Sequence, residues 1–363
     1  MSDVGSHRTA RRTPRAWTAV NSILLIGLTG WILGPGILAS PPAAPIVGVP
    51  MPEPTVARPA PTVTAPAITR DDLLRPPGIH FGLSAPEVPW SSAEIERIAA
   101  GAGHRPTVLQ YFLKWTEEFR GSAITMCYRH GAVPVLSWEP WSGLRNGVDQ
   151  PTYALAKIAR GDFDGYITRV ATAIRDQEWP LAIRFAHEMN GNWYPWSEQT
   201  SGNRPGDYVR AWRHVHDIFR RVGATNVVWI WSPNIVRPVP GIDLRRLYPG
   251  DAYVDWIGLV GYAVTEHTAA AVFDPSLTTL ARFTDKPVII TETGVRPSGF
   301  QSAWIQDFFR WLPARPQVIG FIWFEFSREQ GGTEDWRFTN SDASIRAFRA
   351  GLASIQVAPP PVG

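Results

Sequence analysis

Eight short apolar runs, separated by helix-like segments, are the feature that most limits how this chain can fold. The runs occupy residues 78–84, 107–115, 133–141, 181–188, 226–234, 254–262, 287–294 and 318–326. Amphipathic stretches such as "AEIERIAAG" and "AWIQDFFRWL" lie between them. Eight strand–helix units predict a (β/α)8 TIM barrel of about 250 residues, in the α/β class. A doubly wound open sheet fits less well, because no Gly-rich phosphate loop follows the first run.

The composition is that of a globular protein and excludes several partners. Of the 363 residues, 44% are hydrophobic and 18% are charged, which is not the balance of a disordered chain. The net charge of +3 depends on the four arginines at positions 8, 11, 12 and 15. The remainder is close to neutral, so we expect no nucleic-acid partner. The single cysteine, Cys127, rules out an intrachain disulfide, and we expect it to be a buried structural thiol.

The chain divides into four zones. Residues 1–38 combine a basic start with a charge-free stretch, "AWTAVNSILLIGLTGWILGPGIL", long enough for a membrane span. Prolines stand where a cleavage site belongs, so a signal anchor is favoured over a cleaved signal peptide. Residues 39–69 are a Pro/Ala-rich linker, 70–357 the barrel, and 358–363 a tail. We expect an exported domain, attached to the membrane through the N-terminal helix, or secreted if that segment is cleaved.

Polar residues gather where the fourth and seventh runs end. In a TIM barrel the active site lies at the carboxyl ends of the strands. "LAIRFAHE" ends in Glu188, and "PVIITETG" contains Glu292. Side-chain alternation puts Arg184 and Glu188 on the inner face, together with Ala182 and Ala186.

The same alternation puts Glu292 on the inner face of the seventh run, above Val288 and Ile290. A buried arginine needs an anionic partner, and Glu292 is the candidate for Arg184. The simplest alternative is that these two residues form a buried ion pair and nothing more.

Tryptophan is unusually abundant, with 17 residues. Trp is rarely fully buried, and its flat face suits the apolar face of a sugar ring. Residues near strand ends are the expected sugar platforms: Trp138, Trp141, Trp193, Trp196 and Trp323. Residues in or beside helices are expected in the core: Trp90, Trp212, Trp304 and Trp311. Near these platforms, Glu139 either binds a sugar hydroxyl or pairs with a base, and Asn190 either orients Glu188 or caps the turn.

The motifs argue against metal and serine chemistry. A metalloprotease helix requires H-E-x-x-H, but Gly191 stands where the second histidine belongs. A G-x-S-x-G elbow is absent. Two glutamates at one barrel mouth instead suggest glycoside hydrolysis, with one general acid and one nucleophile or base. That chemistry requires no metal and no cofactor.

The stretch "HEMNGNW" at 187–193, with "ITETG" at 290–294, resembles glycoside hydrolase family 26. The resemblance extends over residues 75–355 in order and spacing. It implies a retaining endo-β-glycanase acting on β-1,4-mannan or mixed-linkage β-1,3-1,4-glucan, with some family members acting on β-xylan. Val260 precedes the "GY" of the sixth run, where many mannanases have an acid, so the sugar stays open.

The resemblance also implies roles for individual residues. Glu188 matches the acid/base and Glu292 the nucleophile. Positions that match substrate-binding residues are His187, Trp193, Tyr262 and Trp323, and Asn234 lies in a family-like "WSPN". We expect Glu188 to be protonated at rest, with a raised pKa, and Arg184 and Tyr262 to keep Glu292 ionised.

Two other functions remain open from the sequence. One is a membrane-tethered partner of polysaccharide synthesis that edits or transglycosylates glycans. The other is an inactive glycan-binding module on the same fold. In each case the partner is a polysaccharide, and we expect a monomer.

Overall fold

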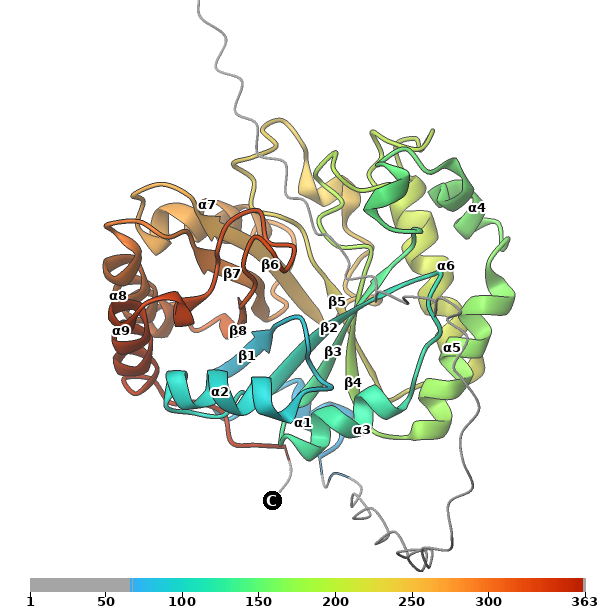
Figure 1. The fold of residues 1–363 in the computed structure, drawn as a ribbon. Helices are drawn as coiled ribbons and strands as arrows, with labels where there is room; N and C mark the ends of the chain where they lie inside the picture. Colours follow the sequence, from blue (N-terminus) through green and yellow to red (C-terminus); the bar gives the residue numbers. More distant parts are fainter. Residues whose placement is uncertain (1–65, 67, 362–363) are drawn as a thin grey trace, which may run out of the picture.

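The computed structural model describes residues 66 and 68–361, and its centre is a closed barrel of eight parallel strands (Figure 1). The strands are β1 His80–Ser84, β2 Val108–Lys114, β3 Val133–Glu139, β4 Leu181–Phe185, β5 Val227–Trp231, β6 Trp256–Ala263, β7 Val288–Val295 and β8 Val318–Phe324. Each strand pairs with the next, and β8 pairs with β1. The TIM-barrel prediction is confirmed, and the open sheet is wrong.

Helices surround the barrel on its outside and at its amino-terminal end (Figure 1). They are α1 Arg70–Leu73, α2 Ser92–Ala102, α3 Ser122–Arg129, α4 Leu155–Ala159, α5 Asp164–Gln177, α6 Asp207–Val222, α7 Ala269–Leu280, α8 Gln301–Trp311 and α9 Asp342–Leu352. Short polar side chains begin several of them. Ser91, Thr268 and Ser341 each accept a hydrogen bond from the third backbone N–H that follows.

The core has two layers because strand side chains alternate between the two faces. The layer between strands and helices contains large side chains such as Ile183 and Phe185 of β4. The layer inside the barrel contains smaller ones, such as Ala182 of β4 and Val135 of β3. Cys127 lies in the outer layer, fully buried, and burial raises the pKa of its thiol, as expected of a structural cysteine.

The short helix α1 lies against the amino-terminal end of the barrel. Thr69 and Asp72 form a capping box that fixes its start. Leu73 packs into the inner layer. Arg70 donates to the carbonyl of Val227 at 2.7 Å and pairs with Asp255 at 2.6 Å. This end of the barrel is therefore built for stability, which leaves the carboxyl end for chemistry.

The anchor predicted in residues 1–38 and nearly all of the linker predicted in residues 39–69 lie outside the described residues. Within residues 66 and 68–361, no helix is both long enough and apolar enough to cross a membrane. The limits predicted for the barrel domain and for the tail stay predictions.

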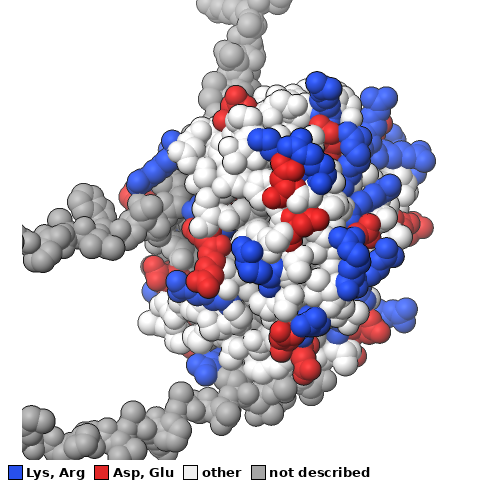
Figure 2. Space-filling model, turned by 90° about the vertical axis from the view of Figure 1, so that its right-hand side faces the viewer, with Lys and Arg blue, Asp and Glu red and all other residues white. Residues whose placement is uncertain are grey.

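The surface over α4, α5 and α6 carries mixed charge. Figure 2 shows basic and acidic side chains interleaved on this face, with no continuous basic surface. Several form ion pairs between residues close in sequence, such as Arg160 with Asp162 and Arg220 with Asp217. A mixed surface of this kind does not attract a polyanion.

Truncation of Leu73 tests whether α1 stabilises the barrel. Leu73→Ala should lower the free energy of unfolding by roughly 2–5 kcal/mol, because it leaves a cavity in the inner layer. Asp71→Ala, at an exposed position of the same helix, should change it by less than about 0.5 kcal/mol. Denaturant unfolding measures both. Equal effects of the two variants would show that α1 does not stabilise the barrel.

Candidate active site

Glu292 reaches the inside of the barrel through an irregularity in β7. Strand β6 pairs Leu259 with Ile290 and then Val260 with Glu292, so Thr291 is an extra residue, as in a β-bulge. Below the bulge Ile289 faces the inner layer and Ile290 the outer one. The predicted stack of Val288, Ile290 and Glu292 on one face is therefore wrong. The bulge lets both Thr291 and Glu292 face inward.

Arg184 and Glu292 form an ion pair inside the barrel. Arg184 Nη1 lies 2.5 Å from Glu292 Oε1, with both side chains buried. Arg184 also donates to Ser137 Oγ at 3.1 Å and to Ser232 Oγ at 2.9 Å. Ser232 in turn bonds Thr291 Oγ1 at 2.8 Å. The predicted pairing of Arg184 with Glu292 is confirmed, and small hydroxyl residues surround the guanidinium.

The second oxygen of Glu292 accepts a hydrogen bond from Tyr262, at 2.7 Å. Burial, and then the charge of Glu292, raise the pKa of the Tyr262 hydroxyl well above its usual value. The phenol therefore stays protonated and donates. The ring of Trp336 packs against Tyr262, with centroids 4.4 Å apart. Both carboxylate oxygens of Glu292 thus accept a hydrogen bond from a fixed donor.

Glu188 lies in a tight loop beyond the end of β4. The strand ends at Phe185, and Ala186 and Glu188 have φ values of 45° and 53°. Left-handed conformations are uncommon for residues other than glycine and concentrate at functional sites. The Glu188 N–H donates to Ser232 O at 2.7 Å, which holds this conformation. Side chains therefore stop alternating between the inner and outer faces after Phe185. Ala186 packs in the outer layer, whereas it was predicted to face inward.

Two donors fix the carboxylate of Glu188. Trp193 Nε1 donates to Oε2 at 2.6 Å, and Asn234 Nδ2 donates to Oε1 at 2.7 Å. Asn190 exchanges two hydrogen bonds with the backbone of Asn234, at 2.8 and 2.9 Å. Asn190 therefore orients Glu188 through Asn234. A Cβ at Gly191 would lie 2.4 Å from the Trp193 ring, so glycine is needed here for the indole to reach Glu188.

The electrostatic setting of Glu188 favours its protonated form. Burial, and then the negative charge of Glu292, raise its pKa to about 7, against a partial offset from Arg184 and its two hydrogen-bond donors. The two glutamates therefore differ in partners: Glu292 has a cation, and Glu188 has neutral donors. A pair of carboxyl groups set apart in this way can divide acid and anionic roles between them.

Glu139 and His187 lie close together beside this pair. Glu139 Oε1 is 3.9 Å from His187 Nε2, and Trp141 Nε1 donates to Glu139 Oε2 at 3.1 Å. Burial raises the pKa of Glu139 to about 7, and burial lowers that of His187 well below its usual value. Glu139 Oε1 and both ring nitrogens of His187 have no hydrogen-bond partner among the described residues. Buried polar atoms without a partner are available to a ligand.

The sequence between α3 and α8 matches a known protein family. The model of glycosyl hydrolase family 26 aligns with residues 124–303. Endoglucanase H of Acetivibrio thermocellus is 30% identical over 292 residues, which are 76% of this chain and 31% of that protein.

The chain belongs to glycoside hydrolase family 26.

Other relatives of the family 26 chain have different named substrates. The β-1,3-xylanase TXYA of a Vibrio species is 27% identical over 176 residues, or 48% of this chain and 36% of that protein. A modular endo-β-1,4-mannanase from Cellulomonas fimi shares the fold, with a TM-score of 0.59, 20% identity, and coverage of 78% and 72% of the two chains. The chain spans about a third of the length of the first curated relatives it matches.

Two of the predicted sugar platforms, Trp138 and Trp323, are wrong in this family 26 barrel. Trp138 and Trp323 face the outer layer, because their neighbours Glu139, Ile322 and Phe324 face inward. Trp138 packs against Trp115, with ring centroids 5.3 Å apart. Trp323 packs 5.1 Å from Phe348 and donates to a backbone carbonyl.

Two further tryptophans support the loop that carries Glu188. Trp196 stacks on Tyr194, with centroids 4.4 Å apart, and donates to His187 O at 2.5 Å. Trp141 packs edge-on against both rings. Trp196 and Trp141 are buried and support this loop, and their role as sugar platforms stays a prediction. Trp193 alone of the five keeps a partly exposed face.

Trp90 departs from its prediction in the opposite direction. Trp212, Trp304 and Trp311 are buried, as expected, but Trp90 is 48% exposed. It precedes α2 and takes no part in the face that this helix buries.

Sequence reasoning missed the small residues around Arg184 and the aromatic wall beside Tyr262. Ser137, Ser232 and Thr291 are ordinary residues in sequence, and only the register across β3, β5 and β7 brings them together. Trp336 and Phe324 form one apolar cluster with Tyr262. The alternation of side chains along β8 could have predicted that Phe324 faces inward. Trp336 lies in a long loop, where no such alternation exists. No group of three or more His, Cys, Asp or Glu side chains among the described residues could hold a metal ion.

The raised pKa of Glu188 predicts a pH-dependent stability. Its folded pKa of about 7 exceeds the ordinary 4.5, so the folded state binds the proton more tightly. The stabilisation is complete below about pH 4.5 and is lost as pH rises to about 7. Glu188→Gln should reduce this loss by roughly 1–3 kcal/mol, measured by urea unfolding across that range. Glu117→Gln, at an exposed position, is the control. If the free energy of unfolding of Glu188→Gln depended on pH as that of the wild type does, the raised pKa of Glu188 would be contradicted.

Proposed function

We propose that this barrel is a retaining endo-β-glycanase that cleaves a β-linked polysaccharide by double displacement. The observation that carries the proposal is the unequal setting of two neighbouring carboxyl groups. Glu292 is bound by Arg184 and Tyr262, whereas Glu188 has a pKa raised to about 7. Membership of family 26, with relatives named as endoglucanase, xylanase and mannosidase, supports a glycan as the substrate.

In the first step, Glu292 attacks the anomeric carbon while Glu188 gives its proton to the departing glycosidic oxygen. Arg184 and Tyr262 hold the two oxygens of Glu292, one of which forms the new bond to the anomeric carbon. Asn234 and Trp193 fix Glu188 in position to donate. The products are a glycosyl ester on Glu292 and a free sugar chain.

In the second step, Glu188, now a carboxylate, removes a proton from water, which attacks the glycosyl ester. Its charge is tolerated because the negative charge of Glu292 is absent while the ester exists. The ester breaks at the anomeric carbon, and the product keeps the β configuration. Glu188 regains its proton, and Glu292 regains its charge.

The proposed substrate class is a neutral β-glycan, either β-1,4-mannan or mixed-linkage β-1,3-1,4-glucan. Glu139 and His187 offer polar atoms without partners to sugar hydroxyls. The aromatic cluster of Tyr262, Phe324 and Trp336 provides an apolar surface beside Glu292. Neither group favours one of the two sugars, so the choice rests on a panel of polysaccharides.

Removal of either carboxyl group tests the proposed roles. Glu188→Ala should lower kcat/KM on a β-glycan by about 10²–10⁴-fold, the usual contribution of general acid–base catalysis, and Glu292→Ala should lower it at least as far. With an aryl β-glycoside whose leaving group needs no proton, the first step should survive in Glu188→Ala but not in Glu292→Ala. Rates near wild type for both variants on a substrate that the wild type cleaves would overturn the assignment.

Loss of the Trp193 donor should move the pH profile. The N–H of Trp193 stabilises the carboxylate of Glu188 and so lowers its pKa. Trp193→Phe should therefore raise that pKa. The pH at which kcat/KM decreases on the alkaline side should then be higher by up to about one pH unit. Gly191→Ala should shift it in the same direction, because its Cβ displaces the Trp193 ring. A shift to lower pH in both variants would contradict the role of this hydrogen bond.

A further inference from the structure

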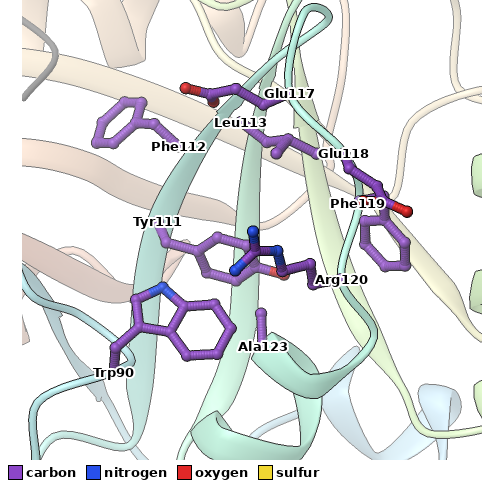
Figure 3. Close-up of a pocket in the computed structure, with 9 residues that line it drawn as sticks. All are labelled: Trp90, Tyr111, Phe112, Leu113, Glu117, Glu118, Phe119, Arg120 and Ala123. Atoms are coloured by element: carbon purple, nitrogen blue, oxygen red, sulfur yellow. The ribbon is translucent and has the colours of Figure 1, made fainter. Parts of the chain in front are cut away.

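A second pocket lies beside the barrel mouth, outside the pair of glutamates. It has a volume of about 420 Å³ and is formed by the loop before α2, strand β2 and the segment that leads into α3 (Figure 3). That volume falls within the range of about 300–1,000 Å³ that small-molecule sites occupy. Trp90, Tyr111 and Arg120 come from these three parts of the chain.

Trp90 offers the pocket an open aromatic face. It is 48% exposed, and every other tryptophan in residues 66 and 68–361 is buried or partly buried. Its backbone is held in place: its N–H donates to Glu87 O at 2.7 Å, and the next residue, Ser91, caps α2. One exposed hydrophobic side chain is common on protein surfaces. Here it borders a pocket, and its rigid backbone keeps it there.

Tyr111 gives the pocket a polar atom that lacks a partner. Its side chain is 9% exposed, and its hydroxyl has no hydrogen-bond partner among the described residues. Figure 3 shows the ring extending from β2 into the region between Trp90 and Arg120. A buried tyrosine hydroxyl normally finds a partner, so a ligand hydroxyl at this point would satisfy it.

The charges of the rim favour a neutral ligand. The side chains of Arg120 and Glu118 have no ion pair or hydrogen bond within the part of the chain that the structure describes, while Glu117 pairs with Lys114 at 3.2 Å. Arg120 offers N–H donors and Glu118 offers acceptors. Two glutamates on the rim oppose an anion. A flat apolar face with both donors and acceptors around it suits a sugar ring.

Phe112 lies between this pocket and the proposed active site. This residue lines the pocket and packs against the cluster of Tyr262, Phe324 and Trp336 at the mouth. Its ring centroid lies 6.1 Å from that of His187. A glycan chain that occupies the mouth would therefore pass Phe112 and reach Trp90.

We propose that Trp90, Tyr111 and Arg120 form a remote subsite for neutral sugar units of the same glycan chain that is cleaved at Glu292. The inference rests on the proposed function for its substrate. It explains why Trp90, unlike the other tryptophans beside helices, is left outside the core.

The test separates binding from cleavage. Two assays compare the wild type with Trp90→Ala, Trp90→Phe and Tyr111→Phe. The first is electrophoresis in gels that contain mixed-linkage β-glucan or β-mannan. The second is kinetics on oligosaccharides of increasing length. Trp90→Ala should be retarded less and should raise KM roughly three- to tenfold on polymer and on the longest oligosaccharides. On the shortest substrate that is cleaved, KM and kcat should not change. Trp90→Phe, which keeps a flat ring, should be intermediate.

Tyr111→Phe removes only a hydroxyl and should weaken retardation without loss of thermal stability. If Trp90→Ala matches wild type in both retardation and length dependence, the subsite is refuted while the proposed function stands. If wild type cleaves none of the glycans but Trp90→Ala still loses retardation, the proposed function fails and the subsite stands. If wild type is neither active nor retarded, both are overturned.

Discussion

The ion pair between Arg184 and Glu292 is the interaction on which the rest of this site depends. The interior of the barrel is otherwise filled by residues such as Val135, Ala182 and Ile289, which give a charge nothing to bind. A guanidinium at this depth is tolerated because a carboxylate lies 2.5 Å away and two serines accept hydrogen bonds from its Nε and Nη1. Loss of one partner of such a pair typically costs roughly 3–5 kcal/mol. Glu292, the proposed nucleophile, is therefore also part of what stabilises the fold.

The two glutamates differ because the protein provides a cation for only one of them. Glu292 lies on β7 with Arg184 and Tyr262 against its two oxygens. Glu188 lies in a loop and has a left-handed backbone conformation. Its side chain is buried, accepts hydrogen bonds from neutral donors, and lies close enough to Glu292 for that negative charge to raise its pKa. Strain in that loop is offset by hydrogen bonds between the loop and the segment after β5, one donated by Glu188 N–H and one by Asn234. In a polar, hydrated cleft Glu188 would lose the burial that is the largest cause of its raised pKa.

The eight strands and their order were predictable from sequence, because each buried strand is a short apolar run next to an amphipathic helix. Alternation also paired Arg184 with Glu292. It failed at two points: the bulge at Thr291 and the turn after Phe185, where no local pattern announces the change. Trp138 and Trp323 were expected at the mouth because they lie near strand ends, but a tryptophan at a strand end can face either layer. The exposure of Trp90 and the position of Trp336 depend on loops, whose conformation follows from tertiary contacts rather than from periodicity.

A covalent glycosyl intermediate is the central claim, and trapping it is the most direct measurement. The protein would be incubated with an activated 2-deoxy-2-fluoro β-glycoside, which slows the second step more than the first, and then analysed by intact and peptide mass spectrometry. The account predicts one added glycosyl group, located on the peptide that contains Glu292, and no such adduct in Glu292→Ala. An adduct on another residue, or turnover of a β-glycan to a product of inverted configuration, would contradict it.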